Sequence, residues 1–397
     1  MIKKYIDKIK ERGIKSYLHF VPTQTLIAII FFILFCFDAL YLFRYDTYQE
    51  SFVLGDWLVN YEDGGFKRRG LSGSFFFLIQ DLTGISLIYL VFFVQLFFCT
   101  LFYVSFYNLL KNKNIPLFYF ILLFSPIAMF FHLSELITVG RKEIIFIALF
   151  SLMAFWQNKK SFTRLKRIFI ILSLFVFTFW HELLLFYITY FILLELLFYN
   201  YSEKGYFNLV KTTATYLLAV LIPAGLIFLF GSEINNGKSI EILQQRGLLL
   251  IKGGIFEYNT NSFETIKNEI NNYLWYLVPF FYGLALVFII LKKQNNLKLF
   301  YLFLLCIFFS IPIFFLAVDW GRWIYIHFTF ILILMGSLLA EKNKNEDKIN
   351  LFSMKDTFIL ILFLLINLSF RMPICNFGLN IGCYPIERLN KIISFLL

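Results

Sequence analysis

The stretch "PTQTLIAIIFFILFCFDALYLF", residues 22–43, carries one charged side chain, Asp38, in an otherwise largely apolar run. About 20 mostly apolar residues suffice for a helix to cross the hydrocarbon core of a bilayer. A spanning backbone must also satisfy its hydrogen bonds within helices or a closed barrel. Similar runs recur along the 397-residue chain, which is 60% hydrophobic with a mean hydropathy of +0.75. The sequence therefore predicts an all-α, polytopic membrane protein.

Charged residues punctuate the apolar runs and locate the predicted spans. We expect about eleven transmembrane helices in one bundle, a single integral membrane domain covering residues 1–397. The predicted spans are 22–43, 83–110, 115–131, 143–157, 168–182, 183–200, 212–231, 273–291, 299–318, 323–340 and 356–371. Residues 71–80 are too short to span and are expected to form a re-entrant or interfacial helix. The tail "IERLNKIISFLL", 386–397, has apolar residues at helical spacing and is expected to lie along the interface.

Lysines gather in alternate connections between these spans. The lysine-rich stretches are 3–10, 111–113, 159–166, 204–211, 292–298 and 342–348. Lys and Arg accumulate in cytoplasmic loops, so these stretches and the N-terminus are predicted to be cytoplasmic. The net charge of +11 then reflects orientation rather than nucleic-acid binding. The remaining connections face outward, and the two longest of them are 44–82 and 232–272.

The arginines do not follow the lysines. Three of the eleven, Arg12, Arg164 and Arg167, fall on the predicted cytoplasmic side. The other eight fall on or near the outer face: Arg44, Arg68, Arg69, Arg141, Arg246, Arg322, Arg371 and Arg388. Arg stays charged in any environment and binds phosphate in a two-point geometry. The distribution therefore predicts an anionic ligand at the outer face.

Four predicted outward segments repeat one theme, an acid, a base and aromatic residues at the end of a helix. They are "GDWLVNYEDGGFKRRG" from residue 55, "HLSELITVGRKE" from 132, "FWHELLLFY" from 179 and "VDWGRWIYIH" from 318. Three of the four histidines, His132, His181 and His327, lie in these segments. Ionisable residues near membrane depth are candidates for function.

Each segment also has a simpler interpretation. Gly64 and Gly65 fit a solvated turn that needs positive φ. Asp319 and Arg322 fit a local ion pair at a helix start. His181 with Glu182 fits a satisfied structural pair, and Arg141 with Lys142 fits the end of a span. No metal-binding spacing such as CxxC or HExxH is present, and no metal or other cofactor is predicted.

The predicted outer face combines three kinds of side chain. Its arginines can bind phosphates, its carboxylates and histidines can act as bases, and its aromatic rings can stack on sugars. Together they suit a lipid-linked sugar pyrophosphate as the ligand. The blocks "GGFKRRGLSG", "GRKE" and "DWGRW", with the architecture of the whole chain, resemble the Wzy-type O-antigen and capsular polysaccharide polymerases of bacteria. The resemblance implies a multi-pass protein of the inner membrane with a GT-C-like helical architecture and a periplasmic active site. It implies block transfer of a glycan from undecaprenyl pyrophosphate to another lipid-linked repeat unit. Membrane lipids, a chain-length regulator and a flippase are the implied partners, and nucleic acid is not.

The site residues predicted on this basis fall into two groups. The candidate bases are Glu182 and His181, with Asp56 and Asp319 behind them. The candidate pyrophosphate or glycan contacts are Arg68, Arg69, Arg141, Arg246, Arg322, Lys67 and His327. Preorganised charges of this kind stabilise a departing pyrophosphate, while a positioned base takes the proton of an acceptor hydroxyl.

Two other functions stay open at the level of sequence. A GT-C glycosyltransferase that uses a polyprenyl-phosphate sugar would rely on an acid of the first outer loop, Asp56 or the pair Glu62 and Asp63. A flippase for lipid-linked oligosaccharides predicts charges along the middle of the spans and an internal repeat. The span interiors are nearly free of charge, and the charges cluster toward one face, which favours a one-sided active site.

Overall fold

The computed structural model describes residues 23–47, 52–199, 201–232, 234, 236–250, 256, 262–341, 354–375 and 380–381. Apart from turns and connections, these residues form helices and one antiparallel pair of two-residue strands, β1 (Phe370–Arg371) and β2 (Asn380–Ile381). They form two compact units. Unit 1 comprises residues 1–30, 106–138 and 261–397, and unit 2 comprises residues 31–105 and 139–260. The predicted basic N-terminal stretch and the predicted interfacial tail 386–397 lie outside the described residues.

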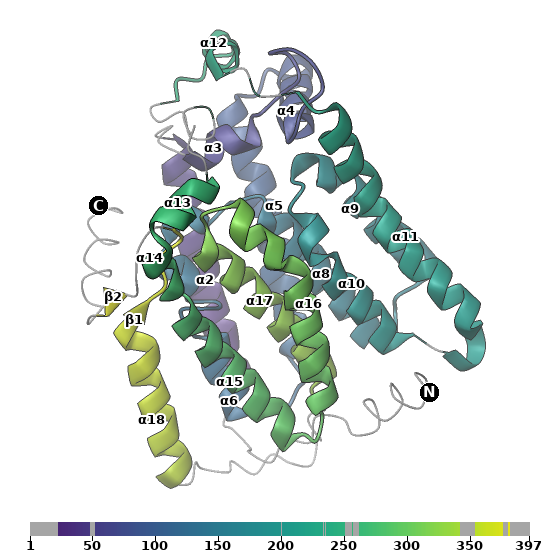
Figure 1. Ribbon diagram of the computed structural model, residues 1–397, viewed down its shortest axis with the longest axis vertical. Helices are drawn as coiled ribbons and strands as arrows, with labels where there is room; N and C mark the ends of the chain where they lie inside the picture. Colours follow the sequence, from purple (N-terminus) through teal and green to yellow (C-terminus); the bar gives the residue numbers. More distant parts are fainter. Residues whose placement is uncertain are drawn as a thin grey trace. The chain divides into compact units, whose positions relative to one another are not determined.

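Unit 2 holds the first long loop and the middle of the chain. Its helices are α3 (Phe52–Trp57), α4 (Gly70–Thr83), α8 (Glu143–Asn158), α9 (Arg164–Trp180), α10 (Leu184–Phe198), α11 (Tyr201–Phe230) and α12 (Asn236–Gln245). Helices α9, α10 and α11 pack together, and α8 packs on α9 and α10 (Figure 1). Helix α11 is kinked at Gly205, where φ is 68°. The core is apolar and aromatic, as in the edge-to-face contact of Phe150 with Phe191.

Unit 1 is built around α17. Its elements are α6 (Leu117–Leu123), α7 (Phe131–Ser134), the short 3₁₀ helix η1 (Leu136–Thr138), α13 (Ser262–Asn268), α14 (Ile270–Leu274), α15 (Leu277–Lys293), α16 (Leu297–Leu316), α17 (Trp320–Leu338) and α18 (Met354–Ser369). Helix α15 packs on α6 and α16, and α17 also contacts both (Figure 1). Helices α2 (Thr23–Thr47) and α5 (Leu87–Leu110) each contribute residues to both units.

Six helices among the described residues are long and apolar enough to cross a membrane. They are Gln24–Arg44, Leu87–Leu110, Gly205–Phe230, Ile270–Lys293, Leu297–Leu316 and Trp320–Leu338. The apolar helices Glu143–Asn158 and Leu184–Phe198 are shorter. The prediction of a helical, multi-pass membrane protein is confirmed, whereas the prediction of about eleven spans rests on sequence alone.

One predicted span is wrong as a single helix. The segment 115–131 contains α6, which ends at Leu123, then a series of turns, and α7 begins at Phe131. Pro126 explains the interruption, because a proline disfavours helical backbone in the residue before it. The amide of that residue, Ser125, donates to the Leu122 carbonyl three residues back at 3.2 Å, which is a turn contact rather than an α-helical one.

Candidate functional site

Residues from three of the four predicted acid–base segments meet inside unit 2. Asp56 lies near the end of α3, and Arg69 immediately precedes α4. Glu182 follows α9, and Glu143 is the first residue of α8. Ion pairs join these side chains to one another, and the charge of Lys142 acts on them. We call the group the Arg69 cluster: Asp56, Arg68, Arg69, Lys142, Glu143, His181 and Glu182.

Arg69 lies at the centre of this cluster. Its Nη1 donates to Asp56 Oδ1 at 2.7 Å. Its Nε and Nη2 donate to the two carboxylate oxygens of Glu182 at 3.3 and 3.1 Å, a two-point contact between residues 113 apart in the chain. The Arg69 backbone is left-handed, with φ of 66°, a conformation that costs a residue with a side chain about 1–3 kcal/mol and is concentrated at functional sites.

Glycines in "GGFKRRGLSG" allow this placement of Arg69. The Gly73 amide donates to the Val59 carbonyl at 2.9 Å, and a Cβ on Gly73 would lie 2.3 Å from that carbonyl oxygen. The start of α4 therefore lies directly on the backbone that follows α3, which brings Arg69 to Asp56. Gly64 and Gly65 have φ of 120° and 79°, so the predicted turn that needs positive φ is confirmed.

The accessible edge of the cluster is formed by Arg68 and Glu182. Arg68 Nε lies 3.3 Å from Glu182 Oε1, and the two side chains are 54% and 24% exposed. By contrast the side chain of Asp56 is 2% exposed. A ligand that approaches the cluster in this structure therefore meets Arg68 and Glu182 first.

His181 links Glu182 to Glu143. His181 Nε2 lies 3.0 Å from Glu143 Oε1, and both side chains are buried. His181 Nδ1 lies 3.7 Å from Glu182 Oε2, beyond hydrogen-bonding distance. The simpler interpretation of His181 and Glu182 as a pair of their own is therefore incomplete, because each has its shortest contact with a residue from another helix.

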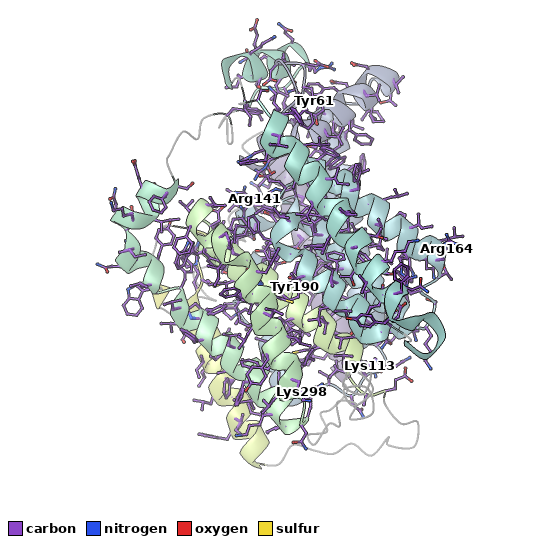
Figure 2. All side chains as sticks on the ribbon, turned by 45° about the vertical axis from the view of Figure 1, so that its right-hand side comes forward. Tyr61, Lys113, Arg141, Arg164, Tyr190 and Lys298 are labelled. Atoms are coloured by element: carbon purple, nitrogen blue, oxygen red, sulfur yellow. The ribbon has the colours of Figure 1, made fainter. Side chains whose placement is uncertain are left out.

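Lys142 and Glu143 are members of the cluster that were not among the predicted site residues. The fully buried Lys142 Nζ donates to Ser72 Oγ at 2.9 Å and to the Trp180 carbonyl at 3.1 Å. Both residues stand in "GRKE", beside the predicted Arg141, so the signal was present in the sequence. Arg141, labelled in Figure 2, is also buried and contributes to the electrostatic field at Asp56.

The cluster holds its two central carboxylates in the charged form. Burial raises the pKa of Asp56, but Arg69 and then Lys142 outweigh it and hold that pKa below its ordinary range. Burial likewise opposes ionisation of Glu182, but Arg69 and Arg68 hold its pKa well below the usual value. Burial lowers the pKa of Lys142 to about 8 against the opposing effect of Asp56. The site is thus an array of fixed charges in a largely buried setting.

Parts of the two predicted long loops dock on each other in unit 2. Asp63 is buried and forms an ion pair with Lys67, and it also accepts a hydrogen bond from Ser239 of α12. The Ser232 amide donates to the Phe66 carbonyl at 2.7 Å. The Lys67 side chain has no exposed surface and neutralises Asp63, and its predicted contact with a ligand stays a prediction.

Arg246 joins the same two loops at the surface. Its guanidinium lies 2.8 Å from Glu62 Oε1 and 2.8 Å from Asp81 Oδ1. It also lies over the Phe77 ring, 4.1 Å from the centroid. Arg246, directly after α12, therefore connects that helix to α4. Its predicted role in binding phosphate or glycan stays a prediction.

The fourth predicted segment lies in unit 1. Arg322 forms a local ion pair with Asp319 at 2.6 Å and lies over the Trp323 ring, 4.3 Å from its centroid. Gly321 is required there, because a Cβ would lie 1.9 Å from the Pro373 carbonyl oxygen. The predicted local ion pair at a helix start is confirmed, and the predicted roles of Asp319 as a base and of Arg322 in binding pyrophosphate stay predictions.

His327 lies in the interior of unit 1, and its predicted contact with a ligand stays a prediction. Its ring is fully buried in α17, 2.7 Å from Ser310 Oγ and stacked on Phe314. His132 is also buried in unit 1, where it lies against Tyr325. Of the three histidines predicted to share a face, His181 is the one that the structure joins to the Arg69 cluster.

No known protein family, curated protein or solved structure matches this chain. Among the described residues, no group of three or more His, Cys, Asp and Glu side chains is arranged to hold a metal ion. The candidate functional site is therefore the Arg69 cluster itself. Its exposed arginine can bind an anion, and its carboxylates can accept a proton or stabilise a developing positive charge.

Proposed function

We propose that this protein is a polysaccharide polymerase that transfers a glycan from undecaprenyl pyrophosphate to a second lipid-linked repeat unit. The observation that carries the proposal is the Arg69 cluster with its accessible edge of Arg68 and Glu182. An anion-binding arginine beside a carboxylate is what transfer from a pyrophosphate to a hydroxyl requires. Helices apolar enough to cross a membrane supply surroundings suited to a polyprenyl chain.

In the proposed reaction, Arg68 binds the donor pyrophosphate and stabilises the charge that develops as it leaves. Glu182 takes the proton of an acceptor hydroxyl, and that oxygen attacks the anomeric carbon while the bond to the pyrophosphate breaks. Arg69 and Asp56 act as positioning residues, because their contact at 2.7 Å is largely buried and fixes the guanidinium that holds Glu182. His181 and Glu143 support Glu182 from the other side.

Donor binding would also activate the base. In the unliganded site Glu182 is a weak base, because Arg69 and Arg68 overcome the effect of burial and hold its pKa well below the usual value. A pyrophosphate bound to Arg68 competes with Glu182 for the same guanidinium. The added negative charge raises the pKa of Glu182, so the carboxylate becomes a stronger base only when the donor is present.

The proposal places the protein in the bacterial inner membrane, with the N-terminus in the cytoplasm and the Arg69 cluster facing the periplasm. It includes a GT-C-like bundle of about eleven spans, in which shorter apolar helices such as α8 and α10 complete the set. A flippase and a chain-length regulator would act before and alongside it, since repeat units must be delivered to the outer face and chain growth must stop.

The first test deletes the gene in its host and separates the surface glycan on a gel. Loss of the long-chain ladder with a single repeat unit retained supports the polymerase. Loss of every repeat would point to a flippase, and a repeat lacking one sugar would point to a glycosyltransferase that adds monomers. Either of these two outcomes overturns the proposal.

The second test complements the deletion with site variants. Arg68→Ala and Glu182→Gln are expected to abolish the ladder without removing the protein from the membrane, and Arg68→Lys to restore part of it. Glu241→Gln, at an exposed carboxylate on α12, is the matched control and should leave the ladder unchanged. A normal ladder from both Arg68→Ala and Glu182→Gln would remove the proposed site.

A further inference from the structure

The turn between α8 and α9, at the far end of these helices from the Arg69 cluster, presents a basic surface. Lys159, Lys160 and Arg164 are exposed within six residues of one another. Arg164 is labelled at the start of α9 in Figure 2. We call Lys159, Lys160 and Arg164 the basic turn. A short connection joins the two helices there, so the three residues are close in the chain.

Neighbouring side chains give the basic turn a fixed shape. Thr163 caps α9, since its hydroxyl accepts from the Lys166 amide at 3.4 Å. Lys166 Nζ donates to the Ser161 carbonyl at 3.0 Å and lies 4.9 Å from the centroid of the Trp156 ring. The Phe162 ring stacks on Trp156. Lys166 thus stabilises the connection between α8 and α9. The exposed charges are those of the basic turn.

A buried network anchors the turn to the rest of unit 2. Arg167 donates to Glu195 Oε1 at 2.6 Å, and the Glu195 side chain is 2% exposed. Glu195 Oε2 also accepts from Gln157 at 3.2 Å and from the Tyr216 hydroxyl at 3.4 Å. Four helices, α8 to α11, therefore meet at one carboxylate directly beneath the turn. Removing one partner of a buried ion pair is strongly destabilising, so the turn is held in place.

An exposed apolar stripe continues from the basic turn along α9. Leu165, Phe169 and Leu172 are 78%, 50% and 59% exposed and follow one another at helical spacing. A cationic group directly above an apolar helix face matches an anionic lipid, whose phosphate lies above its acyl chains. A soluble anion would use the charges but not the stripe.

We propose that the basic turn binds the headgroup phosphate of an anionic phospholipid, whose acyl chains lie along Leu165, Phe169 and Leu172. Charge complementarity and the adjoining apolar stripe identify the occupant. The inference is independent of the proposed glycan transfer, because none of these residues belongs to the Arg69 cluster.

The test measures lipid binding by the purified full-length protein. Native mass spectrometry with added cardiolipin is compared between the wild type and the variant Lys159→Gln/Lys160→Gln/Arg164→Gln. Each basic residue near an anionic lipid contributes about fivefold to binding, so the triple variant is expected to bind cardiolipin at least tenfold more weakly. Arg164→Glu alone, which reverses one charge, is expected to weaken binding in the same direction.

The matched control removes three exposed lysines from another turn, between α15 and α16 in unit 1: Lys292, Lys293 and Lys298. The variant Lys292→Gln/Lys293→Gln/Lys298→Gln should keep most of the binding. Equal losses from both triple variants would show that general basicity is responsible and would overturn the proposal. Equal binding of phosphatidylcholine, or displacement of cardiolipin by millimolar inorganic phosphate, would overturn it as well.

Discussion

Arg69 and Arg322 occupy similar sequence settings and form different structures. Each lies in a segment that combines an acid, an arginine and a tryptophan, and each is largely buried. Arg69 joins carboxylates that lie 13 and 113 residues away. Arg322 pairs with Asp319, three residues away, at the start of its own helix. The same local composition therefore yields an assembled charge cluster in unit 2 and a local pair in unit 1.

The range of the contact, not the composition of the segment, therefore distinguishes a candidate site from a helix start. A local pair requires only the geometry of one helical turn. A cluster drawn from α3, α4, α8 and the α9–α10 turn requires those elements to be folded together. Stability measurements on matched variants can separate the two cases.

The largest expected effect is that of Arg69→Ala. Removing this guanidinium leaves the buried Asp56 without its principal partner and frees Glu182 from a two-point contact. Breaking a buried ion pair costs about 3–5 kcal/mol of unfolding free energy, and we expect a loss in that range from denaturant titration in detergent. Arg322→Ala is the matched variant and should cost less, because Asp319 is 19% exposed and can be solvated. Equal losses would contradict the distinction between the two pairs.

We expect the unfolding free energy to depend on pH through Lys142. This buried lysine belongs to the Arg69 cluster, and the segment around Arg322 has no counterpart to it. Burial lowers the pKa of Lys142 to about 8 from 10.5. Between these values the unfolded chain binds a proton that the folded chain has released, so the unfolding free energy rises with pH. The full difference corresponds to roughly 3 kcal/mol. Subtracting the pH profile of Lys142→Met from that of the wild type isolates this contribution. A flat difference between pH 8 and 10.5 would contradict it.

Much of the fold could be predicted because membrane spans depend on local composition. The segments that became α2, α5, α16 and α17 were located from apolar runs and charged punctuation alone. The prediction of one continuous helix over 115–131 was wrong. The segment is largely apolar, which suggested a span, but Pro126 interrupts the helix. The number of spans could not be fixed either, since apolar helices such as α8 and α10 are short.

Part of the candidate site could be predicted from the sequence, because charged residues at the ends of apolar helices are visible there. Asp56, Arg69, His181 and Glu182 carry charge at predicted helix ends, so their residue types and positions identified them. Sequence does not show burial, so the contacts of Lys67 with Asp63 and of His327 with Ser310 could not be predicted. Lys142 was missed because a lysine at the end of a span ordinarily marks topology.

A smaller effect is expected from the coupling between partners. In a double-mutant cycle, Asp56→Asn with Arg69→Gln should show a coupling energy toward the upper end of the usual range, about 2–3 kcal/mol. The cycle of Asp319→Asn with Arg322→Gln should give about 0.5–1 kcal/mol, as for partly exposed pairs. Both are measured from the same denaturant titrations. A larger coupling for the local pair would reverse the comparison.

Arg246 provides the last and smallest expected effect, and it separates contact range from burial. Its carboxylate partners are distant in sequence, as those of Arg69 are, at 184 residues for Glu62 and 165 for Asp81. Those partners are 45% and 59% exposed, whereas Asp56 is 2% exposed.

Exposed ion pairs contribute below about 1 kcal/mol to the unfolding free energy and are screened by salt. We therefore expect Arg246→Gln to lower the unfolding free energy by less than that amount at low ionic strength, and by less still in 1 M salt. If Arg246→Gln instead cost as much as Arg69→Ala, sequence separation alone would account for the Arg69 result. A small effect would show that the Arg69 cluster depends on burial as well as on range, and burial is what lets fixed charges act strongly on a bound ligand.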